Sequence, residues 1–239
     1  METKRKCPII LGASGTQKTE IVTKMSKIIP LEHIACDKFY TYMHFDTSVG
    51  HPSNDYSKLK SYLARFRHPM EPVMDKNIFG DLACMTIKEK VAQDKMPLAE
   101  GCSVGYFTGL INSQKRFPDV EFAPLIGLYT DDLNEKTIKG KIKEFIELGA
   151  IREVEEAIEH GWSDSYVIKK SVIANPLYNH VKGRITLDNA IDISTSMYLG
   201  VIRDEETKFK SFPNVAWLKH ERGKTDDTAS RIVEIIEKS

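Results

Sequence analysis

Residues 12–19 have the residue types and spacing of a phosphate-binding loop. They read Gly-Ala-Ser-Gly-Thr-Gln-Lys-Thr and directly follow an apolar run at residues 8–11. Residues 20–28 then show the spacing of an amphipathic helix. In a strand–loop–helix context, backbone N–H groups and the helix N-terminus bind phosphate oxygens, and Lys18 adds a positive charge. The pattern therefore predicts a phosphate site; a generic strand-to-helix turn is the alternative.

Individual residues of this loop carry separate expectations. The Thr19 hydroxyl suits Mg²⁺, so Thr19 is the predicted metal ligand. Gln17 stands where such loops usually have a second glycine, at a position that often takes a backbone conformation glycine reaches cheaply. The residues predicted to bind phosphate alongside Lys18 are Gly12, Ser14, Gly15, Thr16, Gln17 and Thr19.

Two further polar positions follow apolar runs that we interpret as strands. Asp37 comes directly after residues 33–36, and Ser103 lies in Glu-Gly-Cys-Ser, directly after residues 97–99. Ligands of open α/β sheets bind at the carboxyl ends of the strands, so both positions are predicted to face the loop. The Asp37 carboxylate is a candidate general base; an N-cap, or a residue that orients water on Mg²⁺, is the alternative. The glycines and hydroxyl near Ser103 also suit an ordinary tight turn.

Apolar runs alternate with segments of helical periodicity along the chain. This alternation predicts an α/β fold: a P-loop NTPase-like core with a parallel five-stranded sheet flanked by helices. We expect one domain over residues 1–239, in which residues 131–213 form a mostly helical lobe continuous with the core. The predicted strands are residues 7–11, 33–36, 97–99, 124–129 and 215–218. The predicted helices are residues 19–27, 56–66, 78–93, 136–160, 187–198 and 229–238.

Composition narrows the class of protein further. The chain has 239 residues, 41% of them hydrophobic and 28% charged, which is ordinary for a globular protein. No apolar stretch approaches the roughly 18 residues of a membrane span, and the start lacks the pattern of a signal peptide. We therefore expect a cytoplasmic protein without a membrane partner. Because 34 basic residues balance 34 acidic ones, a nucleic-acid partner is disfavoured but not removed.

The four cysteines and the last segment have simpler interpretations. Cys7, Cys36, Cys84 and Cys102 lie far apart without zinc-site spacing, which predicts reduced cysteines, three of them in the core. The last predicted helix places isoleucines 232, 235 and 236 on one face. This face is expected to dock on the core or on a second subunit, so a monomer and a homodimer both stay open.

Taken together, these motifs resemble the P-loop isopentenyltransferases, which prenylate the N6 amine of adenine. Residues 12–19 resemble the family's G-x-T/S-G-x-G-K-S/T loop, and residues 36–40 its strand-end aspartate element. Residues 100–103 resemble the E-G-G-S loop, and residues 139–156 the R-V-x-x-M-x-x-x-G-L-x-E-E-V helix. The resemblance covers residues 8–218. The chain departs from the family at Gln17, at Val49 and Gly50 in place of a basic ending, and at Asp204 and Glu205 in place of a basic-plus-glutamine pair.

The resemblance implies a reaction and a role for each site residue. Dimethylallyl diphosphate would be the donor, and Asp37 would accept the proton as adenine N6 attacks C1 of the allyl group. Lys18, the loop amides and Mg²⁺ on Thr19 would stabilise the leaving pyrophosphate, and Ser103 would donate to a diphosphate oxygen. Catalytic roles thus fall to Asp37, Lys18 and Ser103. Lys170 and Arg203 are further candidate cations for the donor, or simply solvated helix charges.

The acceptor and the activity itself have competing interpretations. Members of the family that modify tRNA typically carry a helical insertion, for which residues 131–213 leave little room. With zero net charge, this favours a free adenine nucleotide (AMP, or ADP or ATP) and a cytokinin-type product. A tRNA dimethylallyltransferase is the near alternative. A P-loop small-molecule kinase and a catalytically weakened nucleotide-binding homologue are the others.

Overall fold

The computed structural model describes residues 5–51 and 59–239, and its centre is a parallel sheet. Strands run in the order β3-β2-β4-β1-β5-β6, so β1, which leads into the phosphate loop, is central. The strands are β1 (Arg5–Gly12), β2 (Leu31–Ala35), β3 (Ser61–Tyr62), β4 (Met96–Gly101), β5 (Val120–Tyr129) and β6 (Ala216–Lys219). All pairings are parallel, so the carboxyl ends of these strands share one edge.

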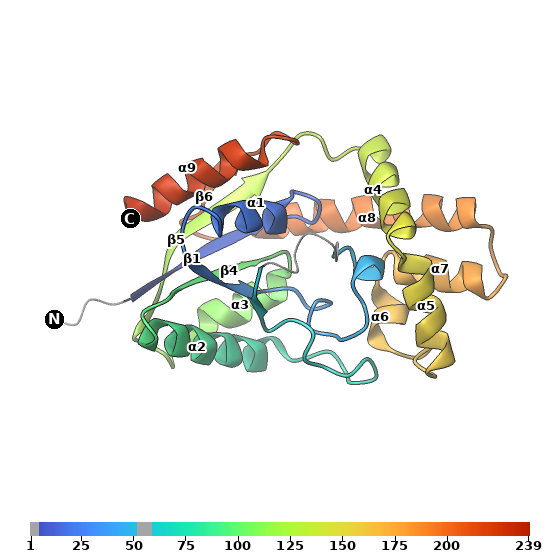
Figure 1. Cartoon of the computed structure of the whole chain (residues 1–239), viewed down its shortest axis with the longest axis horizontal. Coiled ribbons are helices and arrows are strands. Elements are labelled where there is room, and N and C mark those ends of the chain that lie inside the picture. The colour runs from blue at the N-terminus through green and yellow to red at the C-terminus, as the bar shows by residue number, and fades with distance from the viewer. Residues whose placement is uncertain (1–4, 52–58) are drawn as a thin grey trace.

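Helices cover both faces of the sheet and extend beyond one end of it (Figure 1). The α-helices are α1 (Lys18–Met25), α2 (Lys76–Ala92), α3 (Val104–Ser113), α4 (Glu135–Glu147), α5 (Ala150–Glu159), α6 (Tyr166–Lys170), α7 (Ala174–Val181), α8 (Leu187–Phe209) and α9 (Thr225–Glu237). A short 3-10 helix, η1, spans Thr47–Val49. None of the described helices is long and apolar enough to cross a membrane.

The alternation of side chains along β1 divides the core between the two faces. Ile9 and Leu11 pack with α2 and α3 on one face, while Ile10 packs with α1 and α9 on the other. Both faces of a central parallel strand are buried, which is why β1 is apolar at consecutive positions. The expected docking of the last helix is therefore onto the core: Ile232 of α9 is fully buried with Ile21 of α1.

Helices α4 to α8, which we call the helical lobe, have a core of their own. It includes Ile142, Phe145 and Leu177, together with Tyr42 and Phe45 from the loop after β2. Helix α8 connects this lobe to the sheet, because its Tyr198 lies in the lobe core and its Phe209 lies in the cluster with α2 and α3. The lobe occupies the right-hand part of Figure 1, beside the carboxyl edge of the sheet.

The α/β fold with a parallel sheet is confirmed, but several of its elements differ from the prediction. The sheet has six strands because Ser61–Tyr62 pairs with β2, inside residues 56–66 that we predicted to be helical; residues 56–58 lie outside the described part. The helix predicted at residues 136–160 is two helices, separated at Leu148 and Gly149, where Gly149 has φ 111°. Helix α3 was not predicted, and α8 continues past residue 198 to Phe209.

The cysteine prediction is also confirmed. All four thiols are free, and Cys7, Cys36 and Cys84 are buried. Burial raises the pKa of Cys7 and of Cys84 to about 12, so both thiols stay protonated at neutral pH.

Candidate functional site

The phosphate loop leaves β1 at a point where the backbone packs too closely for a side chain. A Cβ on Gly12 would lie 2.4 Å from the carbonyl oxygen of Leu128 in β5, and Gly12 has φ 152°. The loop then turns through Gly15, with φ 86°, into α1. The two glycines of the loop are therefore required by backbone geometry, one at a close approach and one at a positive φ.

Gln17 takes the conformation that glycine would take at the second position of such loops. Its φ of 57° and ψ of 23° are left-handed, and its side chain is held at both ends. Its amide nitrogen donates to Glu20 at 2.6 Å, and its amide oxygen lies 3.1 Å from Nε2 of His220, a buried residue that follows β6. The replacement of glycine is thus accommodated by side-chain hydrogen bonds.

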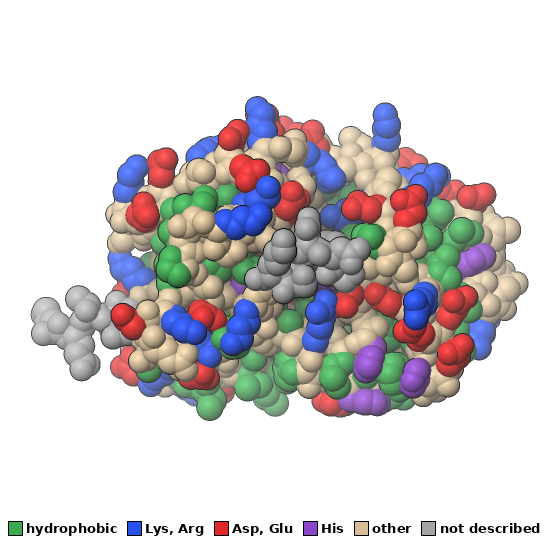
Figure 2. All heavy atoms as spheres, in the orientation of Figure 1, with side chains coloured by type: hydrophobic (Ala, Val, Ile, Leu, Met, Phe, Trp, Pro, Cys, Tyr) green, Lys and Arg blue, Asp and Glu red, His purple; other side chains and the backbone are tan. Residues whose placement is uncertain are grey.

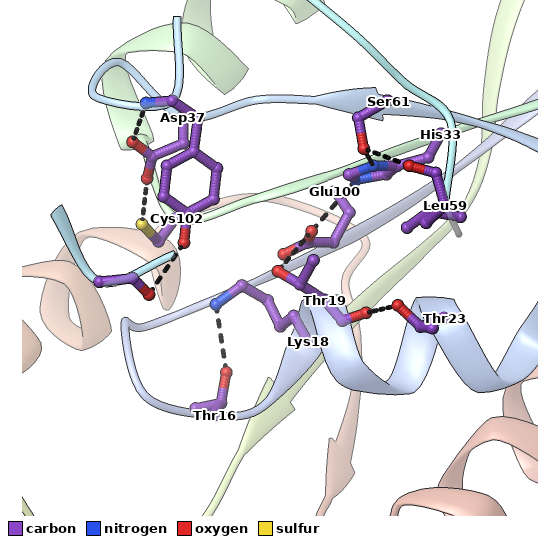
Figure 3. Close-up of polar contacts among 12 residues, drawn as sticks. Thr16, Lys18, Thr19, Thr23, His33, Asp37, Leu59, Ser61, Glu100 and Cys102 are labelled. Carbon is purple, nitrogen blue, oxygen red and sulfur yellow. Dashed lines mark hydrogen bonds and ion pairs between the residues drawn. The ribbon is translucent and has the colours of Figure 1, made fainter. Parts of the chain in front are cut away.

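Lys18 and Thr19 sit at the start of α1, and each has a partner within the protein. The Lys18 ammonium, which is buried, donates to the carbonyl oxygen of Ala13 at 2.8 Å and to the Thr16 hydroxyl at 3.2 Å. Lys18 is thus folded back on its own loop, as Figure 3 shows for the bond to Thr16. The Thr19 hydroxyl donates to Oε2 of Glu100 at 3.0 Å.

Glu100 connects the loop to a buried histidine. Its Oε2 lies 3.2 Å from Nε2 of His33, and Nδ1 of His33 lies 2.7 Å from the Ser61 hydroxyl (Figure 3). Burial acts to raise the pKa of Glu100, but the contacts with His33, Lys18 and Thr19 hold the pKa of this carboxyl below its usual value. Glu100 is therefore an ionised carboxylate buried directly beside the predicted metal ligand.

Asp37 and the β4 end are brought together by another close approach. A Cβ on Gly101 would lie 2.3 Å from the carbonyl oxygen of Cys36, so only glycine fits there. As a result the Cys102 thiol donates to Oδ2 of Asp37 at 2.6 Å, while Oδ1 of Asp37 accepts from the Phe39 amide at 2.8 Å. Burial, followed by the charge of Asp37, raises the pKa of Cys102 well above its usual range. The bond from the Phe39 amide is the contact expected if Asp37 is an N-cap. Asp37 also lines the cavity described next.

A cavity of about 330 Å³ lies between the phosphate loop, the carboxyl edge of the sheet and the helical lobe. It brings together most of the predicted site residues, which are Ser14, Gly15, Gln17, Lys18, Thr19, Asp37, Ser103 and Lys170. Gly12 and Thr16 shape the loop without lining the cavity. Arg203 is not brought to it: this residue is exposed and lines a separate cavity of about 580 Å³ with Trp217 and Tyr129.

Sequence reasoning missed several residues that line the same cavity. Glu100 and Cys102 follow directly from their place at the end of β4. Tyr198, Val201, Glu205 and Lys208 are spaced three and four apart, so one face of a helix carries all of them into the site. The sequence shows this spacing. It does not show that this face of the helix lies against the phosphate loop.

The oxygen donors beside the loop fit Mg²⁺ better than a transition metal. Among residues 5–51 and 59–239, no group of three or more His, Cys, Asp or Glu side chains is placed to hold a metal ion. A hydroxyl on Thr19 next to the Glu100 carboxylate is the sparse, all-oxygen set that Mg²⁺ takes when substrate phosphates supply further ligands. Mg²⁺ at Thr19 stays a prediction.

Fold and site together define a P-loop α/β protein with an acidic group facing its phosphate loop. No family model matches the chain. The tRNA dimethylallyltransferase of Dictyoglomus turgidum is 20% identical over 279 residues, covering 87% of this chain and 86% of the relative. That of Kosmotoga olearia is 31% identical over 101 residues, covering 41% of this chain and 32% of the relative. The solved tRNA isopentenylpyrophosphate transferase of Staphylococcus epidermidis has the same fold, with a TM-score of 0.84, 17% identity and coverage of 99% of this chain and 100% of that one.

These matches confirm the resemblance to the P-loop isopentenyltransferases, and they support a prenyltransferase. They also correct the expected acceptor, because the matched proteins are named for tRNA and not for a free nucleotide. The assignment to cytokinin biosynthesis from AMP was therefore wrong. It rested on net charge, which does not report local charge, and on length.

The argument from length fails on the alignment itself. The 87% of this chain that aligns with the Dictyoglomus relative is about 208 residues, in an alignment of 279 positions. About 70 positions of the relative thus have no counterpart here, yet the match extends over 86% of that protein. A chain that is shorter than the Dictyoglomus relative can therefore still be related to tRNA-modifying enzymes.

Proposed function

We propose that this protein transfers a dimethylallyl group from dimethylallyl diphosphate to the N6 amine of an adenine in tRNA. The proposal is carried by one observation: the phosphate loop, Asp37 and Ser103 line a single cavity in a chain that aligns along most of its length with a tRNA dimethylallyltransferase. The donor and the tRNA acceptor come from the names of the relatives. The placement of the residues comes from this chain.

The chain's own residues support each part of the transfer. The bond between N6 and C1 of the allyl group forms as the bond between C1 and the diphosphate oxygen breaks. Asp37 takes the proton that N6 loses, because its carboxylate lines the cavity at the carboxyl edge of the sheet and can act as a general base there. The leaving pyrophosphate is stabilised by the loop amides and by Lys18, once its ammonium turns from Ala13 toward the ligand.

Mg²⁺, when bound, would supply positive charge to the diphosphate. Thr19 would hold it, and Glu100 would orient the Thr19 hydroxyl and any water on the metal. Ser103 directly precedes α3 and lines the cavity, which suits a donor to a diphosphate oxygen, and Lys170 lines the cavity from the end of α6.

The test is a transfer assay with three classes of acceptor. Purified protein, Mg²⁺ and dimethylallyl diphosphate are incubated with unmodified tRNA, with AMP, ADP or ATP, or with no acceptor, and nucleosides are analysed by mass spectrometry after digestion. We expect dimethylallyl addition to adenine in tRNA. Addition to free nucleotides alone would contradict the proposal. No addition to any acceptor, with pyrophosphate still bound, would identify a catalytically weakened homologue instead.

A further inference from the structure

The carboxylate of Glu205 lies against the phosphate loop. Its Oε2 accepts a hydrogen bond from the backbone N–H of Ser14 at 2.7 Å. Ser14 lies 191 positions earlier in the chain, so this contact joins α8 to the loop across the cavity. The N–H groups of such a loop are the donors that receive phosphate oxygens. A carboxylate oxygen at this donor therefore stands where an anionic ligand would bind.

Among residues 5–51 and 59–239, no Lys, Arg or His forms an ion pair with this carboxylate. Lys18, whose charge lies nearby, donates instead to Ala13 and Thr16. The charge of Asp37, a carboxylate that lines the same cavity, opposes the ionisation of Glu205. Burial raises the pKa of Glu205 to about 7, against the lowering effects of the Ser14 hydrogen bond and of Lys18. Near neutral pH the group thus lies close to its midpoint of ionisation.

Charged and titratable groups from several elements line the cavity together with Glu205. They are Lys18 and Glu20 of α1, Asp37, Lys38 and Tyr40 after β2, Glu100 of β4 and Cys102 after it, Lys141 of α4, Lys170 of α6 and, on α8 itself, Tyr198, Asp204 and Lys208. Burial lowers the pKa of Lys141, with the charges of Arg222 and Lys18 among the further causes. The cavity therefore disfavours the positive charge of Lys141 as well as the negative charge of Glu205.

We propose that Glu205 is a specificity-determining residue that competes with the donor diphosphate for the Ser14 amide, so that the loop admits only an anion able to displace it. The inference rests on the proposed function insofar as the anion is a diphosphate. On binding, the Glu205 side chain leaves the loop, and the Ser14 N–H passes from the carboxylate to a phosphate oxygen. The residue acts as a competitor for the ligand and takes no part in bond making.

The sequence itself suggests the informative substitution. The family that this chain resembles has glutamine in the pair that Asp204 and Glu205 replace here. A glutamine keeps an oxygen that can accept from Ser14 but brings no negative charge toward a diphosphate. Glu205→Gln therefore removes the repulsion while preserving size and shape. Glu205→Ala removes the acceptor altogether and serves as the second variant.

The experiment measures binding of inorganic pyrophosphate by titration calorimetry, with and without Mg²⁺, at pH 6 and pH 8. The matched control is Glu206→Gln, which removes the same charge one residue along α8, where the side chain lines the separate cavity. We expect Glu205→Gln and Glu205→Ala to bind pyrophosphate about tenfold or more tightly than wild type, because neither variant places a negative charge at the Ser14 N–H, and hydrogen bonds to charged groups are the stronger ones. The gain should be larger at pH 8 than at pH 6, and Glu206→Gln should match wild type.

The outcomes separate this inference from the proposed function. Equal affinity in wild type and both Glu205 variants, or an equal gain in Glu206→Gln, would overturn the competition while leaving diphosphate binding and transfer intact. Pyrophosphate binding by the variants and not by wild type would support it most strongly. If no protein binds pyrophosphate, the loop does not take a diphosphate, and both the donor assignment and this inference are wrong.

Discussion

Asp37 is where the proposed chemistry depends on a single side chain. Its Oδ1 caps the turn that begins at Phe39 and its Oδ2 accepts the Cys102 thiol, so a substitution has to keep one acceptor for the turn. Asn keeps it and removes the base. We expect Asp37→Asn to lower the rate of transfer by about 10²–10⁴-fold, the range for loss of a general base, with little change in thermal stability. Rates at saturating donor and acceptor, with a melting curve, check this.

Asp119 provides the matched control for that substitution. It is exposed, is paired with Lys88 on the surface and does not line the cavity. Asp119→Asn should leave the rate within about twofold, because exposed ion pairs contribute little. A rate for Asp37→Asn equal to that of Asp119→Asn would remove Asp37 from the mechanism.

The raised pKa of Glu205 also predicts how stability varies with pH. A carboxyl whose pKa is about 7 in the folded state and near 4.5 when unfolded keeps its proton longer in the folded protein. Between these values the folded state binds more protons, so its stability contribution falls as pH rises through this window. Glu205→Gln should therefore be more stable than wild type at pH 8, by about 1–3 kcal/mol, and nearly equal at pH 4.5.

Denaturant unfolding at both pH values measures this difference, with Glu206→Gln again as the control. A Glu205→Gln variant that is less stable than wild type at pH 8 would mean that the Ser14 hydrogen bond outweighs the buried charge.

At the scale of elements, one carboxylate of the lobe makes five hydrogen bonds to the loop after β2. Glu153 of α5 accepts from the backbone N–H groups of Asp46, Thr47 and Ser48 and from the hydroxyls of Thr47 and Ser48, at distances of 2.6–3.0 Å. Thr47 and Ser48 are fully buried, so donors that lose this partner have no access to water. The carboxylate thus fixes η1, and with it the wall of the cavity at Val49 and Gly50.

We expect Glu153→Gln to lower the free energy of unfolding by about 2–4 kcal/mol. The amide nitrogen would face N–H and O–H donors in place of one carboxylate oxygen, and buried unsatisfied donors cost about 1–3 kcal/mol each. Urea unfolding measures the change. Glu155→Gln on the exposed side of the same helix should change it by less than about 0.5 kcal/mol. A similar small change for Glu153→Gln would show that the contact is not needed for packing.

The elements also show which parts of the site local sequence could predict. The loop, Asp37 and Ser103 were found because each follows an apolar run, and in a parallel sheet such positions share an edge. Glu205 could not be placed that way, since its contact with Ser14 depends on how α8 crosses the sheet. The two-residue strand β3 exists only through its pairing with β2, so no local pattern marks it. The break at Gly149 had a signal, the glycine, but apolar periodicity continues on both sides and concealed it.

At the scale of the whole molecule, charge bears on how the protein would hold tRNA. Lysines and arginines are interspersed with acidic side chains over the face seen in Figure 2, in keeping with equal numbers of each sign. Binding that depends on few phosphate contacts releases few counterions. We expect the logarithm of the tRNA association constant to fall with the logarithm of salt concentration with a slope of only about −2 to −4, against about −5 to −9 for six to ten contacts.

Fluorescence titrations of labelled tRNA between 50 and 200 mM KCl, concentrations over which the effect is large, measure this slope. A slope steeper than about −6 would point to a concentrated basic surface elsewhere on the molecule, and would show that overall charge is a poor guide here.

The contact between His220 and Gln17 has a consequence for the order in which the site is made. During synthesis the loop is made well before the residue that holds Gln17, which follows it by 203 positions, and α9, which covers α1, follows later still. Glu205 also arrives long after Ser14. A growing chain that already contains the whole loop therefore still lacks His220, which holds Gln17, and Glu205, which competes for the Ser14 N–H. The ligand site therefore becomes complete only after the segments that carry Glu205 and His220 have been made.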